Sequence, residues 1–295
     1  MVGTATGKGF SRLGHNVYFC DRSHSRLLDL QEQGYQVEEI IQDAILKTEI
    51  SFICVGAPTQ DNSGKQDLTE LISILTNIAS VINNTDDYHL LVFRTTLLPG
   101  TTRNIIVHYL EKNSSAKNGK NYGIIYNPEF LREGTALVDF LKSDRVIIGA
   151  ENGGVNHYSI LREIYEPITP NIITVSYEAA ELIKYVSNCF LSLKISFFNE
   201  IGILCEKLGI DDKLVNFAVS LDKRIGSYGT ESGRPFGGSC LPKDTEAFAA
   251  FIRNNNIQPD LVQTALKINQ ILSSESAKHQ AYFRYRRNKI MQADL

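Results

Sequence analysis

The sequence lacks the features that mark several classes of protein. Its net charge is only −3, which gives no electrostatic case for binding nucleic acid or an anionic membrane. No apolar run approaches the ~20 residues that a bilayer span needs, and no basic-then-apolar secretory segment opens the chain. Its five cysteines are scattered without a CxxC pair, which argues against a disulfide framework and a zinc site. We therefore expect a cytoplasmic protein with no metal and with no nucleic-acid or membrane partner.

The 295 residues are enough for two domains, and the pattern of apolar residues changes once along the chain. Up to about residue 175, short apolar runs typical of buried parallel strands alternate with stretches of helical spacing. The expected strands are Asn16–Asp21, Ile50–Gly56, Leu90–Arg94, Ile124–Tyr126, Val146–Gly149 and Ile172–Val175, and the expected helices are Leu68–Ile82 and Pro99–Leu110. This alternation predicts an α/β fold, with a Rossmann-like parallel sheet domain over residues 1–175 that is covered on both faces.

The opening of the chain has the pattern of the middle of a dinucleotide-binding unit. A helix is expected to end at Gly14, and the strand after it closes on Asp21. In a dinucleotide-binding fold an acid at this point bonds the cofactor ribose, although Asp21 could equally cap the next helix. Gly3 would be the third glycine of a GxGxxG fingerprint, whose first strand and first two glycines are absent. We therefore expect a chain that is truncated at this end.

A long helix is expected from Tyr177 to Leu208, where apolar residues recur at helical spacing, and Gly209 would end it. At 1.5 Å per residue it would be roughly 48 Å long, so it either links two domains or pairs with another subunit. Lys184 and Asn188 lie four residues apart and so share one face of this helix. They could present an ammonium and an amide to one ligand, or they could be a surface lysine beside an ordinary asparagine.

Helical patterns continue after the long helix, over residues 214–221 and 245–271. They predict a helical central domain over residues 176–295. The basic run Arg284–Arg287 is expected to be a solvated helix face.

A group of chemically active residues stands in the glycine-rich stretch from Phe236 to Asp244. Cys240 follows a Gly-Gly-Ser run, and a backbone without side chains can approach a ligand closely. Lys243 would favour the thiolate form of this cysteine, and the Asp244 carboxylate could position water or move a proton. A glycine-rich turn with a buried cysteine is the plainer interpretation. Because glycine, cysteine, lysine and aspartate crowd within nine positions, we interpret Cys240 as a nucleophile.

Polar residues also stand at the ends of two expected strands. Glu129 and Glu133 are candidates for acid–base chemistry, or else members of an ion-pair network with Arg132. Thr95 and Thr96 could bond a ligand or cap the next segment.

Taken together, these motifs resemble the UDP-glucose/GDP-mannose dehydrogenase family, whose members use NAD to oxidise the C6 alcohol of a nucleotide sugar to a carboxylate. The resemblance runs through nearly the whole chain. Its motifs are Gly3–Gly7 with Gly14–Val17 and Asp21, Val55–Thr59, Arg94–Thr101, Asn127–Thr135 with Asp139–Phe140 and Asp144–Arg145, Ala180–Tyr185 with Asn188, Lys194–Glu200, Asp222 with Arg224–Ile225, and Phe236–Asp244.

The resemblance implies a catalytic role for six residues. Cys240 would hold the intermediate aldehyde as a thiohemiacetal and then as a thioester. Lys184 and Asn188 would stabilise the oxygen charge that develops at C6. Asp244 and Thr96 would hold the catalytic water, and Glu129 would assist proton transfer.

The resemblance also assigns the binding sites. NAD would be the cofactor, contacted by Gly3, Asp21, Pro58, Thr59, Thr96, Glu133 and Lys243. The nucleotide sugar would be bound by Phe130, Leu131, Lys184, Asn188, Phe236 and Gly237, and by Arg224 reaching into a neighbouring subunit's site. A homodimer through the long helix and a role in polysaccharide biosynthesis are implied as well.

The sequence departs from the family pattern at both ends. The first strand with Gly-x-Gly and the third, nucleotide-gripping domain are absent, so we expect a fragment that turns over poorly. UDP-glucose is the expected substrate, with GDP-mannose or another nucleotide hexose as the alternative. Two other functions stay open: a single-step β-hydroxyacid dehydrogenase, which would not need Cys240, and a dimerising module without turnover.

Overall fold

A computed structural model describes residues 1–59, 65–84, 88–151 and 157–274, so the basic run Arg284–Arg287 lies outside the described residues. The described residues form two compact units. The first holds Met1–Pro58 and Gln66–Lys184, and the second holds Thr59, Lys65 and the described residues from Tyr185 onward.

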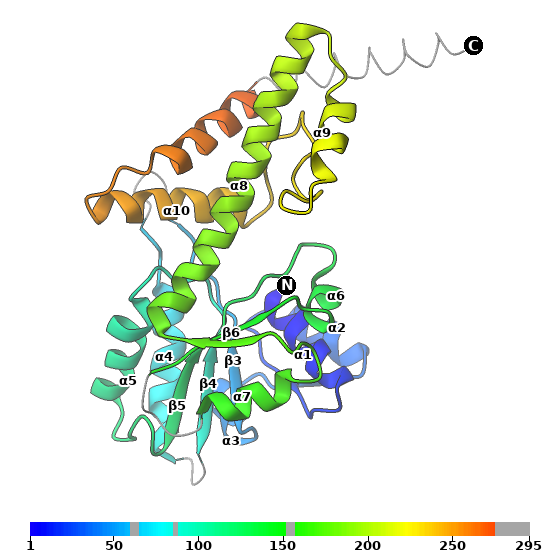
Figure 1. The fold of residues 1–295 in the computed structure, drawn as a ribbon. Coiled ribbons are helices and arrows are strands. Elements are labelled where there is room, and N and C mark those ends of the chain that lie inside the picture. The colour runs from blue at the N-terminus through cyan, green and yellow to red at the C-terminus, as the bar shows by residue number, and fades with distance from the viewer. Residues whose placement is uncertain (60–64, 85–87, 152–156, 275–295) are drawn as a thin grey trace. The chain divides into compact units, whose positions relative to one another are not determined.

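The first unit is built on a five-stranded sheet (Figure 1). In spatial order its strands are β3 (Ile50–Ile53), β4 (His89–Phe93), β5 (Tyr122–Tyr126), β6 (Val146–Gly149) and β7 (Ile172–Val175). The strands β3, β4 and β5 run parallel, as do β6 and β7, but β5 and β6 pair antiparallel through Tyr126 and Gly149. The sheet is therefore predominantly parallel, as the sequence predicted, with one antiparallel pair. The connection between the antiparallel strands holds the short helix α6 (Ala136–Leu141).

Helices cover both faces of this sheet, and β4 shows how the two cores arise. Leu91 and Phe93 belong to a core shared with α4 (Thr69–Val81) and α5 (His108–Asn113). Leu90 and Val92 point to the opposite face, into a core shared with α1 (Val2–Arg12), α6 and α7 (His157–Tyr165). All four β4 residues are fully buried, which explains the unbroken apolar run that predicted a central strand. The remaining elements of this part are α3 (Ile41–Leu46), the short 3-10 helix Ile82–Asn84, and the π-helix η2 (Thr102–Val107).

A second, two-stranded parallel sheet lies beside α1 and consists of β1 (Tyr18–Phe19) and β2 (Gln36–Val37), with α2 (His24–Glu32) between them. The expected strand Asn16–Asp21 is thus shorter than predicted. The helix before it does end just ahead of Gly14, which has φ +93°. Glycines let α1 pack closely, since a Cβ on Gly7 would lie 2.4 Å from the Phe19 ring and one on Gly9 would lie 2.1 Å from Phe140.

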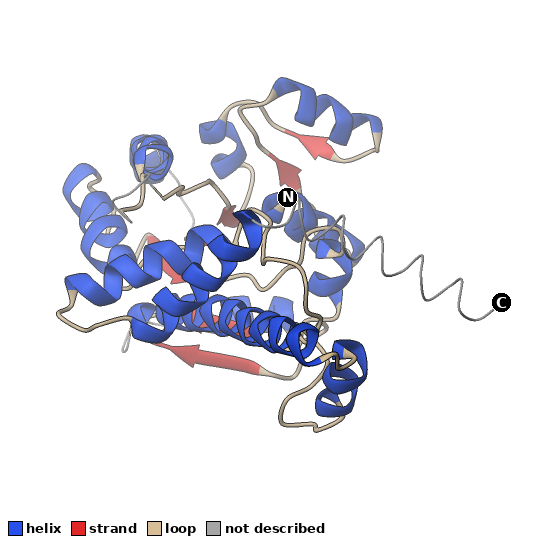
Figure 2. Cartoon of the chain, turned by 90° about the horizontal axis from the view of Figure 1, so that it is seen from above, coloured by secondary structure: helices blue, strands red, loops and turns tan. Residues whose placement is uncertain are grey.

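The second unit is built from helices and loops (Figure 2). After α8 (Tyr177–Leu208) come α9 (Asp212–Ser220), α10 (Leu241–Asn254) and a helix over residues 260–274. The single helix expected over 245–271 is in fact two helices. The break follows α10, where Asn256 adopts φ +61° and Pro259 starts the next helix. The long helix α8 has the bounds that the sequence predicted, and the division between the units falls inside it, after Lys184, whereas the sequence placed a boundary before it.

Helix α8 carries polar side chains on a buried face and large apolar side chains on an exposed face. Its buried polar side chains, each at most 7% exposed, are Glu181, Lys184, Asn188, Ser192, Ser196 and Asn199. Its exposed apolar side chains, each at least 40% exposed, are Leu182, Val186, Phe190, Phe197, Leu204 and Leu208. Both sets recur at intervals of three, four or seven residues, so each follows one face of the helix.

Within the described part of the chain, α8 is also the one helix long and apolar enough to cross a membrane by length and composition. Its most apolar window has a mean hydropathy of 1.2. A single such helix is weak evidence, because core helices pass the same test.

Candidate functional site

The first unit brings Glu129 and Lys184 together in a buried ion pair. Glu129 follows β5 in an Asn-Pro-Glu segment, and Lys184 lies in the second turn of α8. The Lys184 Nζ lies 2.9 Å from Glu129 Oε1 and donates a second hydrogen bond of 2.6 Å to the Glu129 carbonyl oxygen. Burial by itself would raise the pKa of Glu129, but the charge and hydrogen bond of Lys184 outweigh burial and hold that pKa below its usual value. Glu129 is therefore ionised at neutral pH.

The aromatic ring beside this pair belongs to Phe130. The centroid of this ring lies 5.5 Å from Lys184 Nζ and 4.1 Å from the Arg145 guanidinium, so both cations make cation–π contacts with Phe130. Glu129, Phe130, Leu131 and Arg145 line one pocket of the first unit. The Leu131 N–H donates 2.6 Å to Glu129 Oε2, which fixes the carboxylate relative to this pocket.

A buried hydrogen-bond network fixes the start of the segment that carries Glu129. Arg94, at the end of β4, donates to Asn127 Oδ1 and, at 2.7 Å, to the Tyr165 hydroxyl. Asn127 Nδ2 in turn donates 2.8 Å to the Ile147 carbonyl. Arg94 thus joins the two segments that carry Thr96 and Glu129, and its charge adds to the lowering of the Glu129 pKa.

Thr96 lies in the segment after β4, and that segment is held through its backbone. The side-chain amide of Gln66 donates 2.8 Å to the Thr96 carbonyl and accepts from the Leu98 N–H at 2.9 Å. Thr95 donates 2.9 Å to the Val55 carbonyl. Thr95 is therefore engaged in the fold, which leaves the half-buried Thr96 side chain as the candidate for a ligand.

The residues expected to bind the cofactor in the first unit are Gly3, Asp21, Pro58 and Glu133. Asp21 follows β1, accepts from the Ser23 N–H at 2.9 Å and lies 3.5 Å from an Arg26 nitrogen, so its carboxylate keeps accepting capacity. Gly3 lies in the first turn of α1, where a Cβ would contact Cys54 at 3.4 Å. Pro58 and Glu133 are exposed. A dinucleotide-binding unit provides a carboxylate that can accept a hydrogen bond after such a strand, as Asp21 does, and a closely packed helix start, as at Gly3. These residues therefore fit NAD.

The second unit brings together Cys240, Asn188, Asp244 and Lys243. Cys240 occupies the N-cap position of α10, with Pro242 in the first turn, and its Sγ lies 3.6 Å from Ser239 Oγ. Asp244 is buried and accepts from Asn188 Nδ2 at 2.6 Å and from Lys243 Nζ. Thr59 donates 3.4 Å to the Lys243 carbonyl. One carboxylate therefore links the amide of α8 to the helix start that presents the cysteine.

Burial distinguishes Cys240 from two other cysteines. It raises the pKa of Cys189 to about 12 and the pKa of Cys54 to about 11, which makes both thiols poor nucleophiles at neutral pH. Cys240 is half-buried and lies at the N-terminus of α10.

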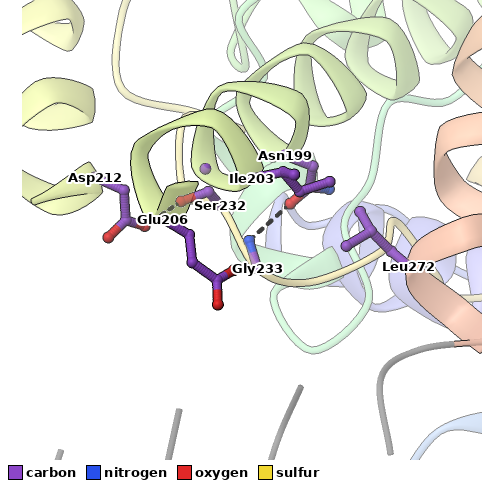
Figure 3. A pocket seen from close by; sticks show the side chains of 8 residues that line it. Asn199, Ile203, Glu206, Asp212, Ser232, Gly233 and Leu272 are labelled. Carbon is purple, nitrogen blue, oxygen red and sulfur yellow. Dashed lines mark hydrogen bonds between the residues drawn. The ribbon is translucent and has the colours of Figure 1, made fainter. Parts of the chain in front are cut away.

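The glycine-rich segment before Cys240 is clamped from α8. Asn199 accepts from the Gly233 N–H and donates to the Arg234 carbonyl, both at 2.8 Å, as Figure 3 shows for the first of these bonds. Asn269 donates 3.0 Å to the carbonyl of the buried Phe236. The small pocket in Figure 3 lies beside this clamp and holds none of the expected site residues. Gly237 follows as an exposed residue with open space around it.

Arg224 does not join either group. It is exposed and pairs with Asp222, whose carboxylate it contacts at 2.6 Å. The Arg224 side chain is 89% exposed, which leaves its guanidinium accessible to another subunit.

The expected site residues thus fall into two groups, one in each unit, and α8 contributes to both through Lys184 and Asn188. Sequence reasoning assigned no role to Glu181, Gln66, Arg94 and Asn199. The signal for Glu181 and Asn199 was present, because both continue the spacing of Lys184 and Asn188 along one face of α8.

The features that define a dinucleotide-binding dehydrogenase fold are a predominantly parallel sheet with helices on both faces, a smaller sheet whose β1 strand is followed by an acid, and a helical unit after them. Comparison with known proteins gives the family. Residues 29–169 match the NAD binding domain, and residues 178–271 the central domain, of the UDP-glucose/GDP-mannose dehydrogenase family. The chain belongs to this family, which disfavours a β-hydroxyacid dehydrogenase. NAD is the cofactor of the matching domain.

Individual relatives agree with this membership. The chain is 33% identical over 291 residues to UDP-glucose 6-dehydrogenase AglM of Haloferax volcanii, with 91% of this chain and 67% of the relative covered. It is 32% identical over 292 residues to GDP-mannose 6-dehydrogenase of Pseudomonas putida, with 91% and 66% covered. Among solved structures, a UDP-glucose dehydrogenase from Pyrobaculum islandicum superposes with a TM-score of 0.84 at 34% identity over 92% of this chain and 66% of that one. The chain therefore spans about two thirds of the length of these relatives.

Proposed function

We propose that this protein oxidises the C6 alcohol of a nucleotide sugar to a carboxylate, a four-electron reaction that consumes two NAD. The observation that carries the proposal is the Asn188–Asp244–Lys243 group at the helix start where Cys240 stands. A single-step alcohol dehydrogenase needs no thiol, whereas an enzyme that oxidises beyond the aldehyde can use a thiol to hold the aldehyde between the two oxidations.

NAD, when bound, accepts a hydride from C6 in each of the two oxidations. Between them, the Cys240 thiolate adds to the aldehyde carbon and gives a thiohemiacetal, which keeps the intermediate on the protein. Loss of the second hydride leaves a thioester, and water then releases the carboxylate and regenerates the thiol. Lys184 and Asn188 are suited to stabilise the oxygen charge at C6, because each carries donor hydrogens on the same face of α8.

Hydrolysis of the thioester needs a base and an oriented water. Glu129 is suited to move the proton, because Lys184 and Arg94 keep it ionised. Asp244 and Thr96 would orient the water. Phe130, Leu131, Phe236 and Gly237 would contact the sugar, and Pro58, Thr59, Glu133 and Lys243 would lie near NAD.

UDP-glucose is the first substrate candidate, since relatives with that name reach 36% identity, as in Rickettsia bellii. GDP-mannose is the second, supported by the relative at 32% identity. The uronate product would serve polysaccharide biosynthesis in the cytoplasm. The proposed assembly is a homodimer, because the described residues leave the apolar face of α8 exposed, and Arg224 would then serve the neighbouring subunit's site.

Intact-mass analysis tests this proposal. The protein is incubated with NAD and, separately, UDP-glucose or GDP-mannose, quenched in acid, and digested to locate any adduct. We expect an acyl adduct on Cys240 with one nucleotide sugar and none without NAD. An adduct on another cysteine, or carboxylate formation without any adduct, would overturn the role of Cys240.

A further inference from the structure

Glu181 is a fully buried carboxylate in the first turns of α8 that receives three hydrogen bonds. Its Oε2 accepts from the Gly100 N–H at 2.6 Å, and its Oε1 accepts from the Thr102 N–H at 2.7 Å and the Thr102 hydroxyl at 2.6 Å. Its side chain is 0% exposed, in the first unit of the chain.

These contacts fix the end of the segment that carries Thr96. Gly100, with φ +93°, closes the turn after that segment, and Thr102 begins the π-helix η2. The first N–H groups of a helix have no partner inside it, and here the carboxylate supplies one. Without Glu181, the Gly100 and Thr102 donors would be left buried and unpaired.

Glu181 also stands three residues before Lys184, on the same face of α8. The two side chains hold the two segments that follow neighbouring strands: Glu181 holds the segment after β4, and Lys184 holds Glu129 after β5. We propose that Glu181 is a positioning residue, which in its ionised form fixes the Thr96 segment relative to the Lys184–Glu129 pair. The effect on catalysis rests on the proposed function, whereas the hydrogen bonds of Glu181 to Gly100 and Thr102 do not depend on it.

The ionisation of Glu181 makes this positioning depend on pH. Burial raises the pKa of Glu181 to about 7, although the hydrogen bonds from Thr102 and Gly100 favour the ionised form. The charged groups around it are Glu178 on its own helix, which raises the pKa further, Arg103 on η2, which pairs with Glu178, and Lys184, which pairs with Glu129. Protonation removes the charge that strengthens these three hydrogen bonds and turns one acceptor position of the carboxylate into a donor, so the three contacts weaken. The Thr96 segment is accordingly held best above about pH 7.

Amide NMR tests the contact without reference to activity. In the folded chain, the 1H–15N resonances of Gly100 and Thr102 are followed from pH 5 to pH 8.5. We expect both to shift with a midpoint near 7 in the wild type, to keep a midpoint that is somewhat lower in the control E178Q, which removes the charge of Glu178, and to show no such midpoint in E181Q. Because E181Q also removes a buried charge on which the fold depends, T102V provides a second variant: removing one donor to the carboxylate should move the Gly100 midpoint upward by about 1 pH unit. Amides that titrate below pH 5 or not at all, or a T102V midpoint that does not move, would overturn the inference.

Kinetics then test the consequence. With NAD and UDP-glucose, we expect E181Q to lower kcat more than it raises KM, and to remove an acid limb near pH 7 from the kcat profile, whereas E178Q keeps that limb. An E181Q profile that keeps the limb, with only the melting temperature lowered, would show a purely structural role and overturn the inference. A wild-type chain without turnover would count against the proposed function, and the NMR midpoints would still decide the inference.

Discussion

Lys184 and Glu129 form an ion pair in which each side chain is only 4% exposed, with 2.9 Å between Nζ and Oε1. The cost of taking both charges out of water is offset by two further hydrogen bonds, one from Lys184 to the Glu129 carbonyl and one from the Leu131 N–H to the carboxylate. Such a pair stabilises the fold little as a whole. Breaking one side of it, however, leaves a buried charge without a partner.

That asymmetry gives the first prediction. Lys184→Met should lower the free energy of unfolding by about 3–5 kcal/mol at pH 7, because it leaves Glu129 charged and buried. The double variant Lys184→Met/Glu129→Gln should recover a large part of the loss. Urea unfolding of the two single variants and the double variant measures the coupling. Additive losses would mean that the two charges do not depend on each other.

The thiol chemistry gives the second prediction. Cys240→Ser should abolish carboxylate formation, because a serine hydroxyl is a far weaker nucleophile than a thiolate at neutral pH. The exposed Cys20 offers a matched control, and Cys20→Ser should leave the rate unchanged. The measurement is the uronate formed from UDP-glucose with NAD, by chromatography. Product at the wild-type rate from Cys240→Ser would remove this residue from the mechanism.

The acid after β1 gives the third prediction. Asp21→Asn should weaken NAD binding by roughly tenfold to a hundredfold, which corresponds to the free energy of one hydrogen bond to a charged group. It should also reduce the preference for NAD over NADP. The wild type should favour NAD, since Asp21 would repel a 2′-phosphate. Calorimetric titration with both cofactors checks this, with Asp29→Asn on the exposed side of α2 as the control. Equal NAD affinity in wild type and Asp21→Asn would take Asp21 out of the ribose site.

The exposed stripe of α8 gives the fourth prediction. Phe190→Glu should convert a dimer into a monomer, because it places a charge in the middle of the apolar face that the partner would cover. Val138→Glu is the matched control, since Val138 is an equally exposed apolar residue on α6. Light scattering at micromolar concentration distinguishes the two masses. A monomeric wild type would refute the proposed assembly.

A buried histidine gives the fifth prediction. His89 lies in β4 with its Nε2 2.9 Å from Ser51 Oγ, and burial lowers its pKa from 6.5 to about 4. Between those values the unfolded chain binds a proton that the folded chain does not, so stability falls as the pH drops from about 6.5 towards 4. The loss attributable to His89 should reach about 2 kcal/mol at pH 5, at 1.36 kcal/mol per pKa unit. Glu181, whose raised pKa acts in the opposite direction, is present in all the proteins compared, so the test by urea unfolding is a difference: from pH 7 to pH 5 the free energy of unfolding should fall by about 2 kcal/mol more in the wild type and in His108→Asn, an exposed control, than in His89→Leu. The same slope in all three proteins would contradict it.

How far the sequence determined the structure differs between elements, for physical reasons. The bounds of α8 were predicted correctly because breakers flank a long stretch with a single glycine inside it, and this pattern is local. The antiparallel pairing of β6 was not predictable in the same way, since the direction in which two strands pair depends on contacts between distant segments. Pro259 is a local signal for the break after α10, but helical spacing continues on both sides of it and gave the more prominent pattern.

The candidate site shows the same division. The motifs gave Lys184, Glu129, Asn188 and Asp244, and the structure pairs them as buried partners within each unit. Glu181 and Arg94 were missed because their role is to hold backbone segments far away in the sequence. The spacing along α8 marks the face on which Glu181 lies, but the partners of Glu181 and Arg94 depend on the fold, and no local pattern signals those partners.

The exposed apolar face of α8 has a thermodynamic consequence for the proposed homodimer. In an ordinary surface helix, the apolar face stabilises the chain that carries it, at any concentration. In the proposed homodimer a second molecule would take this face out of water, so part of the folding free energy would follow mass action. The melting temperature should then rise with the concentration of the protein, and dilution alone should lower the stability of the fold.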